Sequence, residues 1–345
     1  MSFTIAAIKD LIVHHVGNKT AGEDLSISRN SLSLTEEIQH ILLQYFLKPF
    51  KTEELYTFYH DTNLSLNEVY TYVTEIFSNP ESTYQQSIHI AKHLYNQSIH
   101  PNTKGGELYV VHFNECIFRN EVIDAIGIFK SENKDTFLEV EQLKDDFEIE
   151  SRQGININKL DKGCLIFNTS SEAGYVLSII DNTNKGNEAQ YWKDQFLSVQ
   201  IQNNEYHQTN QFLGIAKQFV TKQLEQEFEV NQTDKIDLLN RSVDYFKSHD
   251  NFNKKEFEEE VFADSGIIKS FRKFDQSYRT ENEVELSDSF EISTQAVKKQ
   301  ARVFKSVLKL DKNFHVYIHG NRDMIEQGID ENGRKFYKIY YQEER

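Results

Sequence analysis

The chain has 345 residues and a mass of 40.5 kDa, and 38% of its residues are hydrophobic, which is enough to bury one or two cores and excludes wholesale disorder. A mean hydropathy of −0.61 argues against a membrane protein, and 38 Lys and Arg against 54 Asp and Glu give a formal net charge of −16. Two cysteines, Cys116 and Cys164, are too few for a disulfide framework or a zinc knuckle, so we expect a reducing, cytoplasmic location. Lys9 and Asp10 interrupt the first apolar run, and no signal peptide is expected.

The N-terminal third predicts a short hairpin followed by three helices. Alternation of apolar and polar residues over 24–34 is typical of strands. Thr35, followed by Glu36 and Glu37, is a predicted cap for a helix that runs to Pro49. A second helix is expected from a Ser65 cap to Pro80, and a third over 82–97.

From residue 105 to 181 the sequence predicts an antiparallel sheet. Short runs rich in Val, Ile, Phe and Tyr follow one another, separated by Asn, Gly, Asp and Lys turns. The connections are too short to hold the helices that parallel strands would need. We therefore expect an α+β fold, with an N-terminal α+β domain over 1–182.

The remaining residues, 183–345, predict a mainly helical C-terminal domain. Helical periodicity predicts helices over 188–202, 211–228 and 294–308. A further helix is expected to begin at a Thr233 cap. A strand is expected over 314–318, and the turn sequence of residues 330–333 predicts a terminal β-hairpin. The fold class is then α+β with a small terminal antiparallel sheet.

Positive charge gathers near the end of this acidic chain. Residues 296–312 hold six basic residues and one acid, whereas residues 1–265 carry a net charge of −18. On a helix over 294–308, Lys298, Arg302, Lys305 and Lys309 would line one face, beside an apolar stripe. One interpretation is a surface that contacts DNA phosphates, and the other is an ordinary solvated helix face. The DNA-contacting set would comprise Lys298, Lys299, Arg302, Lys305, Lys309, Lys312, Arg334 and Lys335.

A second basic group contains Lys269, Arg272, Lys273 and Arg279, interleaved with Phe271, Phe274 and Tyr278. Aromatic residues beside cations can stack on the bases of single strands. The same spacing is also typical of the buried edge of a helix, and we favour that structural interpretation.

Residues with catalytic or metal-binding potential are better explained as structural. His14, His112 and Asn114 lie in expected strands, and no partner at a useful spacing completes a site. One acidic group contains Glu139, Glu141, Asp145, Asp146, Glu148 and Glu150. These carboxylates could bind magnesium, but acidic residues at alternate positions are more simply explained as the solvated face of two strands. Common catalytic signatures are missing. We expect no enzymatic activity, no cofactor and no metal.

The order of these features resembles the bacterial 37-kDa nucleoid-associated protein family, the YejK/NdpA-like proteins. The resemblance spans the chain and rests on IKDLIVHHVGNK, KGGELYVVHF, LDKGCLIFN, DNTNKGNEAQYWKDQFL and the long stretch from FRKFDQSYRTENEVELSDSF to KLDKNFHVYIHG. It implies a cytoplasmic, nucleoid-localised protein that binds double-stranded DNA without a cofactor. With it, the basic C-terminal face is the favoured DNA contact.

Two other functions remain open on the sequence. The strongly acidic first 265 residues suit an adaptor that binds a DNA-bound protein, such as a topoisomerase or another nucleoid protein. A nuclease that uses the acidic strands with a divalent ion is the third hypothesis. No membrane partner is expected, and the sequence leaves a homodimer open.

Overall fold

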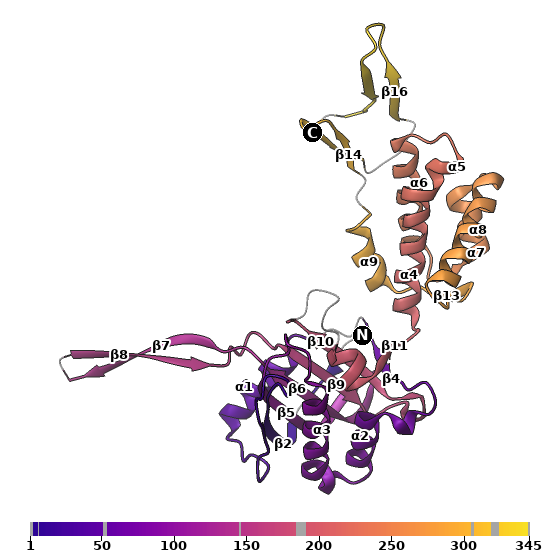
Figure 1. The fold of residues 1–345 in the computed structure, drawn as a ribbon. Coiled ribbons are helices and arrows are strands. Elements are labelled where there is room, and N and C mark those ends of the chain that lie inside the picture. Colours follow the sequence, from indigo (N-terminus) through magenta and orange to yellow (C-terminus); the bar gives the residue numbers. More distant parts are fainter. Residues whose placement is uncertain are drawn as a thin grey trace. The chain divides into compact units, whose positions relative to one another are not determined.

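The computed structural model describes residues 3–5, 7–50, 54–144, 146–183, 191–304, 307–318 and 324–343 (Figure 1). The chain divides into two compact units, Met1–Gln202 and Asn203–Arg345. The sequence pattern placed this division at 182/183. The structure places it later because the π-helical turn η4 (Tyr191–Leu197) and strand β11 (Val199–Ile201) belong to the first unit, where Trp192 and Phe196 lie in the core. The helix expected over 188–202 is thus confirmed only over Tyr191–Leu197, and β11 replaces its second part.

An antiparallel sheet forms the centre of the first unit, as the sequence predicted. Every neighbouring pair is antiparallel, and β1 (Phe3–Thr4) also pairs with β5. The strand order is β11, β4 (Tyr56–Phe58), β10 (Val176–Asp181), β9 (Lys162–Phe167), β6 (Glu121–Ser131), β5 (Gly106–Phe118), β2 (Ala7–Val16) and β3 (Leu25–Ser26). The hairpin expected over 24–34 is reduced to β3, which pairs with the end of β2.

Both faces of this sheet are buried, which explains the nearly continuous apolar runs of its strands. Along β5, Leu108 and Val110 face one core, and Val111 and Phe113 face the other. Helices α2 (Glu68–Ser78) and α3 (Thr83–Gln97) cover the first core, and α1 (Glu36–Leu47) covers the second. Helices therefore cover both faces of the sheet.

The predicted helix starts are partly correct. Thr35 caps α1 by accepting a hydrogen bond from the backbone of Ile38, as expected. The cap of α2 is Asn67 rather than Ser65, which lies in the short 3₁₀ turn η1 (Leu64–Leu66). Asn67 is the better cap because its side-chain oxygen accepts from Tyr70 N (2.9 Å) while its amide donates to three backbone carbonyls.

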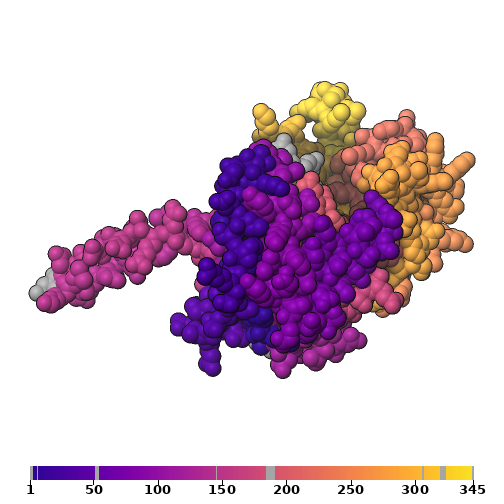
Figure 2. Space-filling view, turned by 60° about the horizontal axis from the view of Figure 1, so that its bottom comes forward, coloured from indigo at the N-terminus to yellow at the C-terminus, as the bar shows by residue number. Residues whose placement is uncertain are grey.

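Strands β7 (Asp135–Leu143) and β8 (Asp146–Gly154) form a two-stranded arm that leaves the sheet between β6 and β9. Figure 2 shows this arm, in magenta, standing clear of the rest of the first unit. The sequence predicted two strands with one solvated face. Along almost the whole arm both faces are exposed, because it extends beyond the layers that would cover it.

The second unit is mainly helical around a core of phenylalanines, as predicted. Six of them are fully buried or nearly so: Phe212, Phe219, Phe246, Phe252, Phe257 and Phe271. The elements are α4 (Glu205–Gln218), η5 (Phe219–Gln223), α5 (Leu224–Glu227), α6 (Gln232–Ser248), α7 (Lys254–Phe257), η6 (Glu258–Phe262), α8 (Ser265–Glu281) and the β12–β13 ladder (Asn251–Asn253 with Ser289–Glu291). Asn231 caps α6 in place of the expected Thr233, in a capping box with Asp234.

The long helix expected over 294–308 is wrong. Helix α9 (Thr294–Ala301) stops early, and β14 (Val307–Leu310) then pairs with β15 (Phe314–Tyr317). Leu308 and Leu310 both pack toward Ile236 of α6, a two-residue repeat that a strand provides and a helix does not.

The terminal hairpin, β16 (Ile325–Ile329) with β17 (Lys335–Ile339), is confirmed. Its turn includes Gly333 at φ +77°, a conformation that favours glycine. Within the described ranges, the helices are too short or too polar to cross a bilayer.

Candidate nucleic-acid interface

The predicted basic residues do not share one helical face, because the helix that would align them ends at Ala301. Lys298 and Lys299 lie in the last turn of α9, and Arg302 caps it. The rest follow on other elements: Lys309 in β14, Lys312 in the β14–β15 turn, Arg334 before β17 and Lys335 at its start. Lys305 lies outside the described residues. The predicted set is thus spread over α9 and two hairpins.

Helix α9 is a short amphipathic helix with its cations at the carboxyl end. Ser293 caps its start, and Ala296 and Val297 are buried. Positive side chains in the last turn are favourable there because the helix dipole is negative at that end. Lys298 is exposed, whereas Lys299 donates to the hydroxyl of Tyr206 (3.0 Å) and lies over its ring. Lys299 is therefore partly held by α4.

The cations of the two hairpins differ in whether they form an ion pair. Lys309 faces outward beside His315, because Leu308 and Val316 of the same ladder face the core. Arg334, in contrast, forms an ion pair with Asp330 (2.8 Å). The backbone N–H and guanidinium of Arg334 hold the pKa of Asp330 below its usual value. Arg334 is therefore less available to an external anion than the other basic residues.

Five predicted cations are exposed and form no ion pair with another residue in the part of the chain that the structure describes: Lys298, Arg302, Lys309, Lys312 and Lys335. Four of them lie between residues 296 and 312, where the sequence contains a single acid, Asp311. Such side chains can each contact one phosphate and displace its counterion.

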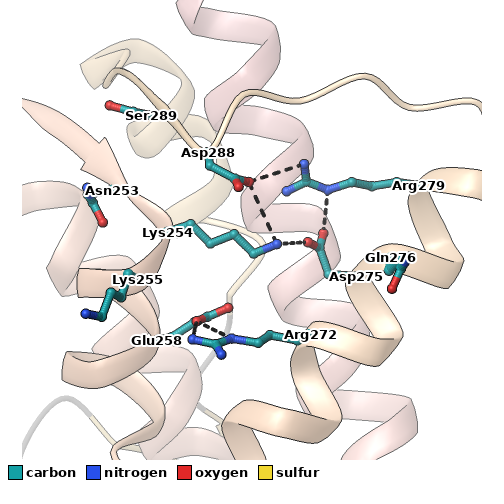
Figure 3. A pocket seen from close by; sticks show the side chains of 10 residues that line it. All are labelled: Asn253, Lys254, Lys255, Glu258, Arg272, Asp275, Gln276, Arg279, Asp288 and Ser289. Carbon is teal, nitrogen blue, oxygen red and sulfur yellow. Dashed lines mark hydrogen bonds and ion pairs between the residues drawn. The ribbon is translucent and has the colours of Figure 1, made fainter.

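Two members of the second basic group, Arg272 and Arg279, form internal ion pairs (Figure 3). Arg279 and Lys254 both contact the buried carboxylate of Asp275, and Arg272 contacts the buried carboxylate of Glu258 (2.7 Å). These residues line a pocket of about 710 Å³ whose positive charges face negative ones. Arg272 and Arg279 therefore stabilise the second unit by compensating buried acids.

The aromatic residues of that group support the same conclusion. Phe271 is fully buried, and Phe274 and Tyr278 are partly buried against the phenylalanine core. The structural interpretation of this helix edge is confirmed, and stacking on exposed bases is not available to Phe271.

The histidines of the sheet also have structural roles, as predicted. His14 is buried and accepts a hydrogen bond from Ser28 N, so its other ring nitrogen donates to Ser87 (2.9 Å). Burial lowers the pKa of His14 to about 4 and keeps it neutral. His112 is buried too, 3.1 Å from an oxygen of Asp124, and burial lowers its pKa.

The acidic group proposed as magnesium ligands lies on the arm. Glu139 is opposite Glu150, and Glu141 is opposite Glu148. Arg152 contacts Glu139 (2.6 Å) and Glu150 (3.4 Å) on the same face. Asp145 lies outside the described residues. This arrangement is a largely acidic, exposed face that contains one arginine.

Sequence reasoning missed a buried polar cluster in the first unit. Lys130 and Lys162 are fully buried on adjacent strands, with the carboxylate of Glu132 between them (3.1 and 3.6 Å). Asp181 also contacts Lys162 (2.9 Å), and the Tyr191 hydroxyl donates to Glu132. Burial lowers the pKa of Lys130. The available signal was a lysine within each apolar run, at the penultimate position of β6 in GIFKS and at the first position of β9 in KGCLIF.

The fold and the C-terminal basic segment define an α+β protein of two units, the fold class that the sequence pattern predicted. A family model described as nucleoid-associated protein YejK (NA37) matches residues 12–334, and the chain belongs to this family of nucleoid-associated proteins. No curated protein matches the chain.

Proposed function

We propose that this protein binds double-stranded DNA directly, without sequence preference, through the exposed cations of its C-terminal segment. The observation that carries the proposal is the set of five exposed cations on α9 and the two hairpins that have no ion-pair partner among the described residues, in a chain with a net charge of −16. Membership of a nucleoid-associated family supports a role at the nucleoid.

The chemistry expected of this surface is contact with phosphates. Lysine and arginine side chains spread over a short helix end and two hairpins carry charge but present no single helix or strand face to base edges. Binding would then release counterions, fall steeply with salt and vary little with sequence. The protein acts in this proposal as a binding protein, and its DNA contact requires no cofactor.

The direct test uses the purified full chain and fluorescently labelled duplexes of two unrelated sequences. Anisotropy titrations at 50 and 200 mM salt should give similar affinities for both duplexes and a strong loss of affinity at the higher salt. Absence of saturable binding at 50 mM salt would refute direct binding.

A second candidate, an adaptor that reaches DNA through a bound protein, is favoured by the β7–β8 arm. Residues 135–154 contain seven acids and two basic residues. One face of the arm carries the four glutamates, and the other exposes Leu138, Val140, Phe147 and Ile149. An acidic face backed by apolar side chains suits a basic protein surface rather than DNA.

The two candidates separate in a pull-down from a bacterial lysate with and without nuclease. Partners retained after nuclease treatment, and lost when the arm is shortened, would support the adaptor. Partners that disappear with the DNA would support direct binding alone.

A further inference from the structure

Three potential metal ligands meet in the second unit. His249 follows the last residue of α6, Glu256 lies in α7 and Glu260 lies one turn later in η6. The Nε2 atom of His249 is 3.9 Å from Oε1 of Glu256 and 3.8 Å from Oε1 of Glu260. One ligand atom from each residue lies within 4.8 Å of the other two.

The hydrogen bonds of His249 determine which ring nitrogen carries its proton. Nδ1 is 2.9 Å from the backbone carbonyl oxygen of Tyr245, and a carbonyl oxygen can only accept. Nδ1 is therefore the donor, and in the neutral ring Nε2 presents a lone pair toward the two carboxylates. A histidine whose second nitrogen donates to a backbone carbonyl is the usual arrangement in metal sites.

The same tyrosine also orients one of the carboxylates. Tyr245 is only 3% exposed, and its ring stacks on His249 with centroids 4.2 Å apart. Its hydroxyl lies 3.2 Å from Oε2 of Glu256 and from the backbone N of Asn253. The phenol donates to Glu256, because a carboxylate oxygen can only accept. Glu256 Oε1 is left facing His249.

The cluster has a deficit of positive charge. Arg241 donates to the backbone carbonyl of Glu260 and lies 3.8 Å from Asp237, so its charge is directed elsewhere. The separations of 3.8 and 3.9 Å are too long for hydrogen bonds between His249 and the glutamates. Two carboxylates that face one ring nitrogen at these distances make the space between them a favourable place for a cation.

We propose that His249, Glu256 and Glu260 bind a divalent transition-metal ion, with zinc or cobalt as the fitting class. One imidazole nitrogen and two carboxylate oxygens suit such an ion better than calcium or magnesium, which favour all-oxygen sites. With bonds of about 2.0–2.2 Å, ligand atoms of a tetrahedral ion are roughly 3.3 Å apart, so a small side-chain movement closes the site. The ion would link the end of α6 to the α7–η6 segment and leave a position for water.

The test uses the metal-free full chain and Co²⁺ as a spectroscopic probe, followed by displacement with Zn²⁺. Titration should give visible d–d absorption that saturates at one equivalent. His249→Ala should abolish it, and Glu260→Gln should weaken Co²⁺ binding by at least about 10-fold. His315→Ala, which removes an exposed histidine of the same unit, should bind as the unaltered protein does.

Thermal unfolding supplies a second readout that does not depend on the cobalt spectrum. Zn²⁺ should raise the Tm of the unaltered protein and of His315→Ala, and leave the Tm of His249→Ala unchanged. Circular dichroism shows whether each variant is folded. Glu260→Gln changes an exposed residue, so the fold should be kept and weaker metal binding then reports the loss of a ligand. No saturable cobalt binding, or equal binding by His249→Ala, would overturn the proposal.

Discussion

Neutralising the basic segment tests the proposed DNA contact quantitatively. Four of these cations are exposed and have no ion-pair partner within the described chain: Lys298, Arg302, Lys309 and Lys312. Changing all four to Gln should therefore change the free energy of unfolding by no more than about 0.5 kcal/mol per site. Together with Lys335 they supply five potential phosphate contacts. Five contacts predict a slope of log K against log salt near −4.5, or roughly a 500-fold loss of affinity between 50 and 200 mM salt.

The quadruple variant retains one of these contacts and should show a slope near −0.9, equivalent to about a 3-fold loss over the same range. Its affinity at 50 mM salt should also be far below that of the unaltered protein. The assay is fluorescence anisotropy with a labelled duplex at four or more salt concentrations, with circular dichroism to check folding.

A matched variant controls for the change in net charge. Changing the four exposed lysines Lys92, Lys144, Lys222 and Lys255 to Gln makes the chain equally more acidic while leaving the C-terminal segment intact. That control should retain a slope near −4.5. Equal slopes in the two variants would refute the assignment of the contact to this segment.

Three further predictions concern the first unit. Because the pKa of His14 is about 4 when folded and about 6.5 when unfolded, the unfolded state binds the proton first. Stability should therefore fall by up to about 3 kcal/mol as pH drops from 6.5 to 4, and His14→Gln should flatten this slope in denaturant titrations. Lys162→Met should cost about 3 kcal/mol, because it leaves Asp181 and Glu132 without one of their buried cations. Replacing residues 136–153 by Asn-Gly should change the free energy of unfolding by less than about 1 kcal/mol, since almost all of the arm is exposed.

Each of these predictions has a distinct contradiction. An unchanged pH slope in His14→Gln would show that other groups control acid stability. Lys159→Gln, at an exposed position beside Asp135, is the control for Lys162→Met and should cost under about 1 kcal/mol. A large loss of stability on shortening the arm would mean that the arm contributes to the fold.

Much of the first unit was predictable because its apolar periodicity is regular. The antiparallel sheet, its order of strand runs and the Thr35 cap follow from local patterns that the tertiary structure reinforces. The two-sided burial of the sheet was not predicted, although uninterrupted runs such as KGCLIF indicate it. The buried lysines were missed because pairing of Lys130 and Lys162 with one carboxylate depends on strand register, which the sequence does not specify.

The candidate interface shows a different limit. Lys298, Arg302, Lys305 and Lys309 fit a helical repeat, and no strong breaker separates them, so the pattern alone favours one long helix. Burial of Leu308 and Leu310 against Ile236 turns the second part into a strand. Tertiary packing therefore decided between two local structures that the sequence permits. The charges were predictable, and their arrangement in space was not.

The most direct test of the central claim is site-specific photo-crosslinking of the full chain to duplex DNA. A benzophenone side chain would replace Val303, which is exposed next to Arg302, or Val122, which is exposed in the first unit. The account predicts a covalent protein–DNA adduct from position 303 that disappears at high salt, and little adduct from position 122. Crosslinking from position 122 with none from position 303, under conditions where DNA is bound, would contradict it.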